Sequence, residues 1–201
     1  MIRREEAGGV LTLTIDRPER ANSLTAAMLA ELAGAVEGTD AAMLILTGAG
    51  EKVFSAGADL DEAKAGLATS PLWERLSGAV AGFPGLSVAA LNGTLAGGAF
   101  GMALACDIRL AVPQASFFYP VAKLGYLPQP SDPARLAALV GPSRAKLILA
   151  AGARLDAAEA LAFGLVDRVL PDARMAAAEM ADGLAGADPA HIAAIKAMVP
   201  G

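Results

Sequence analysis

The 201-residue sequence has very few of the residues on which disulfides, catalytic triads and metal sites depend. It contains one cysteine, Cys106, and one histidine, His191. A lone cysteine cannot form an internal disulfide, which suits a reducing compartment, and we expect a buried, inert thiol. A Ser-His-Asp triad or a histidine metal site would have to be built on His191 alone. Neither is predicted, and no metal or separate cofactor is expected.

Basic blocks, nucleotide-binding motifs and a signal peptide are also missing. Lys and Arg total 16 against 21 Asp and Glu, for a formal net charge of −5, so nucleic acid is not an expected partner. No GxGxxG motif follows a strand and no GxxxxGK[ST] motif occurs, which argues against dinucleotide and P-loop sites. The first residues carry charges without the apolar run of a signal peptide. We expect a cytoplasmic protein.

One long uncharged stretch, residues 86–106, has to be weighed as a membrane span. Its apolar side chains are mostly small, and Asn92, Thr94 and several glycines lower its hydropathy further. We therefore expect a strand, a glycine turn and a helix in this stretch, and no membrane span. The 55% hydrophobic content instead suggests that some apolar surface is buried between subunits of a homo-oligomer.

Hydrophobic periodicity predicts strands that alternate with helices along the chain, which is typical of an α/β fold. Strands are expected at residues 10–15, 43–46, 86–91, 108–111 and 166–170. Helices are expected at residues 25–36, near 61, at 72–83, 98–106, 133–140, 143–151 and 157–163, and twice more after 171. The proline-rich piece 119–133 is expected to be irregular. No linker or repeat is visible, so residues 1–201 are predicted to form one domain.

Four segments, in order and at compatible spacing, resemble the crotonase (enoyl-CoA hydratase/isomerase) family. They are RPERANSL at 17–24, LILTGAGEKVFSAGADL at 44–60, AALNGTLAGGAFGMALACDI at 89–108 and LILAAGARLDAAEALAFGLVDRVL at 147–170. The resemblance implies the crotonase (ClpP-like) spiral of ββα units with C-terminal helices. Residues 171–201 would be a shortened form of that helical segment. It also implies a homo-trimer or hexamer.

The resemblance further implies an acyl-coenzyme A substrate whose thioester carbonyl lies between the N–H groups of Ala58 and Gly98. Physical chemistry supports this placement, because Gly98 begins a predicted helix, where free N–H groups favour a developing oxyanion. Ala56, Ala58 and Leu60 would hold the adenine, and Arg20 and Ala21 would lie along the phosphate-bearing arm. Further substrate contacts are expected at Gly57, Asp59, Gly97, Tyr119 and Gln129.

The acid-base residues of the family are absent from this sequence. Hydratases of the family use two glutamates, and the matching positions here hold Gly101 and Val121. The position of an isomerase acid holds Gln129, an amide. Asp132 is the one carboxylate in that loop and is our candidate base, with a pKa expected to be raised. The competing interpretation makes Asp132 a helix cap in the Ser-Asp-Pro sequence.

Three functions follow from these residues. The first is an enzyme that shifts a double bond or otherwise works through a CoA enolate, with Asp132 as the base. The second is an acyl-CoA-binding protein that has lost its catalytic groups. The third is an enoyl-CoA hydratase with a base from elsewhere in the chain. We favour the first, because a general base has to exist and has to reach its proton.

Overall fold

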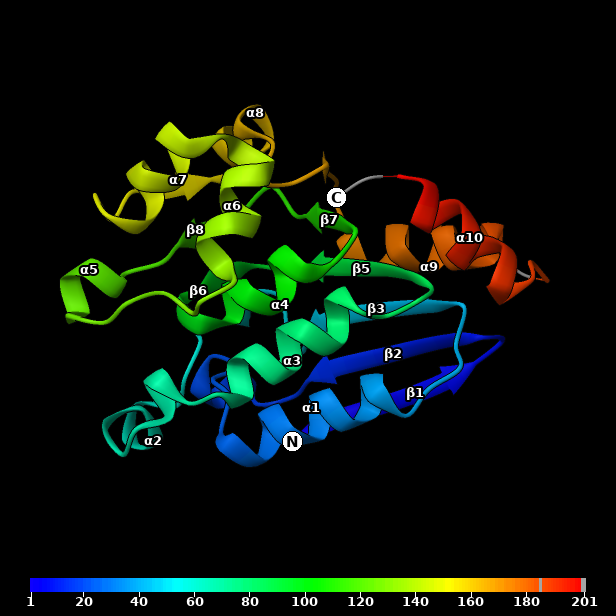
Figure 1. Cartoon of the computed structure of the whole chain (residues 1–201), viewed down its shortest axis with the longest axis horizontal. Helices are drawn as coiled ribbons and strands as arrows, with labels where there is room; N and C mark the ends of the chain where they lie inside the picture. Colours follow the sequence, from blue (N-terminus) through cyan, green and yellow to red (C-terminus); the bar gives the residue numbers. More distant parts are fainter. Residues whose placement is uncertain (185, 200–201) are drawn as a thin grey trace.

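The computed structural model describes residues 1–184 and 186–199, and its largest element is a six-stranded sheet (Figure 1). The strand order is β1-β2-β3-β5-β7-β10, with only the β1–β2 pair antiparallel. The strands are β1 (Ile2–Ala7), β2 (Val10–Ile15), β3 (Met43–Gly48), β5 (Leu86–Leu91), β7 (Ile108–Ala111) and β10 (Arg168–Val169). All six residues of β3 are buried, as expected for a central parallel strand with both faces covered.

A second, smaller sheet lies beside the first. Its order is β4-β6-β8-β9, made by β4 (Val53–Ser55), β6 (Thr94–Ala96), β8 (Ser116–Phe118) and β9 (Arg154–Asp156). Strands β4, β6 and β8 each follow a strand of the large sheet after a short turn, so the chain repeatedly steps from one sheet to the other. The loops that leave β4 and β6 consequently lie next to each other.

Helices cover the two sheets. They are α1 (Ala26–Glu37), α2 (Leu60–Lys64), α3 (Leu72–Ala81), α4 (Phe100–Ala105), α5 (Val121–Leu124), α6 (Asp132–Val140), α7 (Pro142–Leu149), α8 (Ala157–Phe163), α9 (Ala173–Gly183) and α10 (Pro189–Met198), with short 3-10 turns η1 (Pro18–Arg20), η2 (Leu67–Thr69) and η3 (Gly97–Ala99). Helices α1, α3 and α4 pack in sequence on one another, whereas α9 packs against β3, β5 and β7 (Figure 1).

Most sequence-based elements are confirmed. The strands at 10–15, 86–91 and 108–111 and the helix at 157–163 have the predicted bounds. Thr25 caps α1 by accepting a hydrogen bond from Met28 N, as its position suggested. Cys106 is buried. The expectation that residues 119–133 are irregular is wrong in part, because α5 forms there, and the strand predicted at 166–170 is reduced to two residues.

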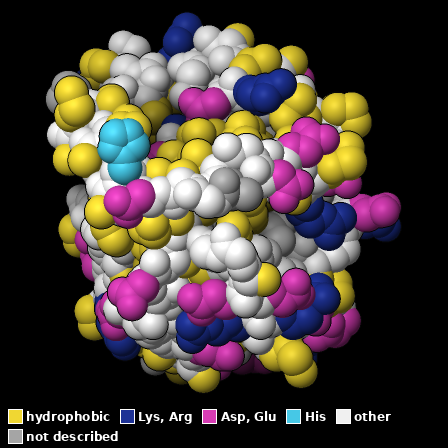
Figure 2. Space-filling view, turned by 90° about the vertical axis from the view of Figure 1, so that its right-hand side faces the viewer, with side chains coloured by type: hydrophobic (Ala, Val, Ile, Leu, Met, Phe, Trp, Pro, Cys, Tyr) yellow, Lys and Arg dark blue, Asp and Glu magenta, His cyan; other side chains and the backbone are white. Residues whose placement is uncertain are grey.

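The face that carries α9 and α10 contains a cavity of about 820 Å³ that is lined mainly by apolar side chains of α3, α4, α6 and α10. Figure 2 shows this side of the molecule, with the exposed His191 at its surface and hydrophobic side chains gathered nearby. None of the described helices is both long enough and apolar enough to cross a bilayer.

Asn22, which follows η1, forms hydrogen bonds to the loop between β3 and β4. Its side-chain amide donates hydrogen bonds to the carbonyls of Ala49 and Val53 at 2.9 and 2.7 Å, and its Oδ1 accepts one from Arg17 N. Asn22 is 1% exposed and adopts a left-handed backbone with φ of 52°. Asparagine tolerates this conformation better than most residues, so both its backbone and its amide suit the position.

We predict that Asn22→Ala lowers the free energy of unfolding by about 2–4 kcal/mol, because the Ala49 carbonyl and the Arg17 N–H lose this partner and the Val53 carbonyl keeps only the 3.3 Å hydrogen bond from Asn92. Chemical denaturation with urea measures this change. The exposed amide of Gln114 provides the control, since Gln114→Ala should alter stability by less than about 0.5 kcal/mol. Equal stabilities for the two variants would contradict this role for Asn22.

Candidate functional site

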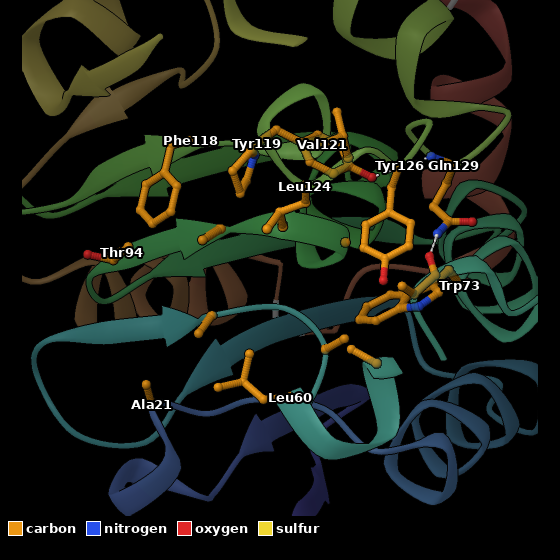
Figure 3. Close-up of a pocket in the computed structure, with 18 of the residues that line it drawn as sticks. Ala21, Leu60, Trp73, Thr94, Phe118, Tyr119, Val121, Leu124, Tyr126 and Gln129 are labelled. Carbon is orange, nitrogen blue, oxygen red and sulfur yellow. Dashed lines mark hydrogen bonds between the residues drawn. The ribbon is translucent and has the colours of Figure 1, made fainter. Parts of the chain in front are cut away.

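A cavity of about 370 Å³ lies where the loop after β4, the start of η3 and residues 118–129 meet (Figure 3). Trp73, Tyr126 and Gln129 lie toward one end of the close-up, and Phe118 and Thr94 toward the other. The wall is made by Ala21, Val53, Ala56, Ala58, Leu60, Ala63, Ala68, Trp73, Thr94, Ala96, Gly97, Gly98, Phe118, Tyr119, Pro120, Val121, Leu124, Tyr126, Leu127 and Gln129.

The backbone on either side of Ala58 is tied to the segment before α1. Leu24 N donates to the carbonyl of Gly57 at 2.8 Å, and Asp59 N donates to the carbonyl of Leu24 at 2.8 Å. These two bonds form a short parallel bridge between Leu24 and Ala58. The Ala58 residue lies between the two bonded groups, on the cavity wall. Its position is therefore set by backbone pairing and does not depend on its own side chain.

Gly98 occupies the first turn of η3, where an N–H group has no carbonyl partner within the helix. The indole of Trp73 covers its Cα so closely that a Cβ on Gly98 would lie 3.1 Å from the ring. Trp73 is in turn fixed by a hydrogen bond of 2.8 Å from its Nε1 to the carbonyl of Leu67. Glycine is thus the residue that fits between this ring and the cavity.

Gly57 and Gly98 bring the two loops into contact. A Cβ on Gly57 would lie 3.2 Å from Gly98 N and 3.0 Å from the carbonyl oxygen of Ala96. Gly57 also has a φ of +89°, in the left-handed region that favours glycine. The N–H groups of Ala58 and Gly98 consequently lie on adjoining segments at the wall of one cavity. Such a pair can stabilise the negative charge that develops on a carbonyl oxygen.

The cavity wall carries no charged residue. Several of its polar groups are already bonded within the protein: Trp73 Nε1 to Leu67, Gln129 Nε2 to the carbonyl of Ala68 at 3.0 Å, and the Tyr119 hydroxyl to Asp132 at 2.8 Å. Asp59, expected at the substrate, instead caps α2 and accepts a hydrogen bond of 2.8 Å from Arg17, which holds its pKa below the ordinary value. Apolar atoms and backbone groups therefore dominate the site.

Asp132 lies behind the cavity wall and has no exposed surface. Its Oδ2 accepts the hydrogen bond from Tyr119, and its Oδ1 has no partner. The interpretation of Asp132 as a helix cap is wrong, because no side chain caps α6 and Ser131 instead donates to Glu74. Burial raises the pKa of Asp132 to about 6, opposed mainly by the Tyr119 hydrogen bond. The expected direction of that shift is confirmed.

A sequence model of a known family matches almost the whole chain. The model described as enoyl-CoA hydratase/isomerase matches residues 5–200. This chain belongs to the enoyl-CoA hydratase/isomerase family. A carnitinyl-CoA dehydratase of Citrobacter koseri is 36% identical over 204 aligned residues, which cover 94% of this chain and 76% of that protein.

Solved structures of the enoyl-CoA hydratase/isomerase family have the same architecture. An enoyl-CoA hydratase from Bacillus anthracis superposes with a TM-score of 0.88 at 33% identity, covering 98% of this chain and 81% of that one. DspI from Pseudomonas aeruginosa gives a TM-score of 0.89 at 36% identity, with coverage of 98% and 85%. The predicted crotonase fold is confirmed.

The structure brings together most of the predicted site residues. Ala21, Ala56, Ala58, Leu60, Gly97, Gly98, Tyr119 and Gln129 all line the cavity. Arg20 is exposed, and Asp59 and Asp132 are buried outside the lining. The two positions that the resemblance matches to the glutamates of hydratases are in this region, since Val121 lines the cavity and Gly101 lies against Asp132. Sequence reasoning missed Trp73, Phe118 and Tyr126, which no motif contains.

We predict that Gly57→Ala impairs acyl-CoA binding at least tenfold, because the added Cβ would displace the loop that carries Gly98. Isothermal titration with a saturated acyl-CoA measures the affinity. Gly152→Ala is the matched control: Gly152 also has a positive φ, of 69°, yet its Cβ would meet no atom within 4 Å. Equal loss in both variants would mean that backbone strain alone, and not contact between the loops, lowers the affinity.

Proposed function

We propose that this family member binds an acyl-CoA thioester with its carbonyl oxygen between Ala58 N–H and Gly98 N–H and stabilises the enolate formed from it. The observation that carries the proposal is the contact between two backbone segments at the wall of an uncharged cavity. Ala21, Ala56 and Leu60 line the part of the wall where the coenzyme arm would enter, with the exposed Arg20 beside them. We also propose a trimeric or hexameric assembly.

Two preorganised backbone donors in an apolar site stabilise an enolate more strongly than water does. The donors are held by the fold before the substrate binds, so they need no reorganisation when charge develops. Loss of one such donor typically costs a factor of about 100–1,000 in kcat, which sets the scale expected here. The uncharged wall strengthens the effect, because no other charge competes for the two N–H groups.

Enolate chemistry at the acyl chain, with isomerisation of a double bond, suits this site better than hydration. Hydration by the two-carboxylate route needs acids that hold and activate water. Gly101 and Val121 cannot do so, and Gln129 is an amide. Hydration is the second candidate, since similar proteins are called carnitinyl-CoA dehydratase and enoyl-CoA hydratase. It would need a base from elsewhere in the chain.

The cavity wall also favours an uncharged acyl chain. A buried carboxylate or ammonium is strongly disfavoured without a partner, and the lining offers no side chain of opposite charge. Its indole, amide and phenol donors at Trp73, Gln129 and Tyr119 are bonded to the protein. Leu60, Leu124 and Leu127 are exposed at the rim and extend the apolar surface outward. An apolar acyl chain matches this lining.

We predict that the protein exchanges α-hydrogens of a saturated acyl-CoA, such as butyryl-CoA, for deuterium in D₂O. Mass spectrometry of the recovered thioester measures the exchange, and the same assay on an enoyl-CoA detects hydration or a shifted double bond. Exchange without a 3-hydroxyacyl product supports enolate chemistry. Accumulation of that product would favour hydration, and absence of exchange across several acyl-CoAs would indicate a binding protein without catalysis.

We predict that crotonyl-CoA binds at least tenfold more tightly than crotonobetainyl-CoA, whose acyl chain carries a quaternary ammonium. The reason is the unpaired charge that the second ligand would bury. Competition against one fluorescent acyl-CoA measures both affinities under the same conditions. Equal affinity, or a preference for the charged ligand, would show that groups other than the cavity-lining residues pair with the ammonium.

A further inference from the structure

Asp132 is a buried carboxylate whose hydrogen-bonding capacity is only partly satisfied among the described residues. It has no exposed surface, one hydrogen bond and one oxygen without a partner. A buried carboxylate in this state costs stability, because a single hydrogen bond offsets its desolvation only in part. Its side chain also caps no helix. A buried carboxylate that is only partly satisfied is a candidate for a functional role.

Gly101 on α4 provides the space that Asp132 fills. A Cβ on Gly101 would lie 2.9 Å from Asp132 Oδ1, closer than a side chain can approach without displacing the carboxylate. Thus the carboxyl group on α6 lies against the position on α4 where hydratases of the family carry a glutamate. The acid on one helix and the glycine on the other are sterically complementary.

Tyr119 connects this carboxylate to the cavity. It lines the cavity and donates a hydrogen bond of 2.8 Å to Asp132 Oδ2. Its ring is stacked on Phe100 with centroids 5.3 Å apart, and Gln129 N donates to its hydroxyl oxygen at 3.4 Å. The phenol is therefore held between the cavity and a proton acceptor.

We propose that Tyr119 is the residue that exchanges a proton with the acyl chain and that Asp132 is a positioning residue that takes and returns the phenol proton. The inference rests on the proposed function. The Tyr119 oxygen takes the α-proton as its own proton passes to Asp132 Oδ2. The electron pair of the broken C–H bond moves into the enolate, whose oxygen is bound by Ala58 N–H and Gly98 N–H. Reversal returns the proton to the α- or γ-carbon, so no other reactant is needed.

The charged groups around Asp132 define the pH dependence of this pair. Burial raises the pKa of Asp132 to about 6; Glu74 on α3 raises it further, whereas Tyr119 and Arg135 on α6 lower it. Burial and the neighbouring Asp132 also raise the pKa of Tyr119, which stays protonated at neutral pH. Proton abstraction needs ionised Asp132. The exchange rate should therefore fall as the pH drops below about 6.

The experiment compares Tyr119→Phe and Asp132→Asn with the wild type in the deuterium-exchange assay. Each variant should lower the exchange rate at least about 100-fold, the usual scale of general acid–base catalysis, with acyl-CoA affinity changed less than about threefold. The double variant should be no slower than either single one, because the two residues act as one unit. The residual exchange rate of Asp132→Asn should no longer fall as the pH drops below about 6.

Thermal unfolding separates this role from a structural one. Because the folded-state pKa of Asp132 is raised, the group lowers stability as the pH rises from about 4 to 6, and the cost remains at pH 7. Asp132→Asn should therefore have an equal or higher Tm at pH 7. A lower Tm, together with an unchanged pH profile, would make Asp132 structural and overturn the proposal.

Gly101→Ala tests the steric complementarity and Gly78→Ala is its matched control. Both glycines are in helices, but a Cβ on Gly78, which is exposed on α3, would meet no atom within 4 Å. Gly101→Ala should reduce exchange at least tenfold and Gly78→Ala should not.

A wild-type exchange rate in Tyr119→Phe would overturn the proposed proton transfer through Tyr119 and leave the proposed function intact. Absence of exchange in the wild type would refute the proposed function itself.

Discussion

The close approach of Gly57 to Gly98 is the constraint on which the rest of the site depends. The two residues follow strands of the small sheet, and only glycine at each position allows the loops to touch. Packing on the outside of this contact is equally tight, because Trp73 covers Gly98 and the Leu24 backbone holds Gly57. The N–H groups of Ala58 and Gly98 are thus positioned by the geometry of the main chain.

Polar groups are distributed unequally between the site and its surroundings. Asn22 and Asn92 satisfy several loop backbone groups just outside the cavity, and Arg17 neutralises Asp59 next to it. The cavity wall itself is left without charge. Interior electrostatics then favour whatever negative charge develops at the two donors, because the low polarity of the wall strengthens their effect. Asp132 Oδ1 and Arg135 Nη1, which are buried without a hydrogen-bond partner among the described residues, are exceptions to this pairing.

The regular parts of the fold were predictable because they depend on local patterns. Apolar alternation located β2, and Thr25 with its following residues marked the start of α1. Strand β1 escaped prediction because Ile2 alone is buried in it, so it has no periodic apolar face. Helix α5 was missed because Pro120 and the prolines that follow suggested an irregular loop. Its first residue, Val121, is buried by tertiary contacts.

The pair of N–H groups at Ala58 and Gly98 and the carboxylate of Asp132 differ in how far a sequence can reveal them. The resemblance of two glycine-containing segments to the family pointed to Ala58 and Gly98, because glycine motifs are tied to backbone geometry. The Ser-Asp-Pro sequence instead suggested a cap, and only the packing of α6 on α4 shows why that reading fails: Gly101 leaves a space into which Asp132 turns. A contact between two helices of this kind is invisible to motif comparison, because no single sequence segment contains both residues. Membership in the enoyl-CoA hydratase/isomerase family consequently identifies the fold, whereas the contact between Gly101 and Asp132 becomes visible only in the packing of α6 on α4.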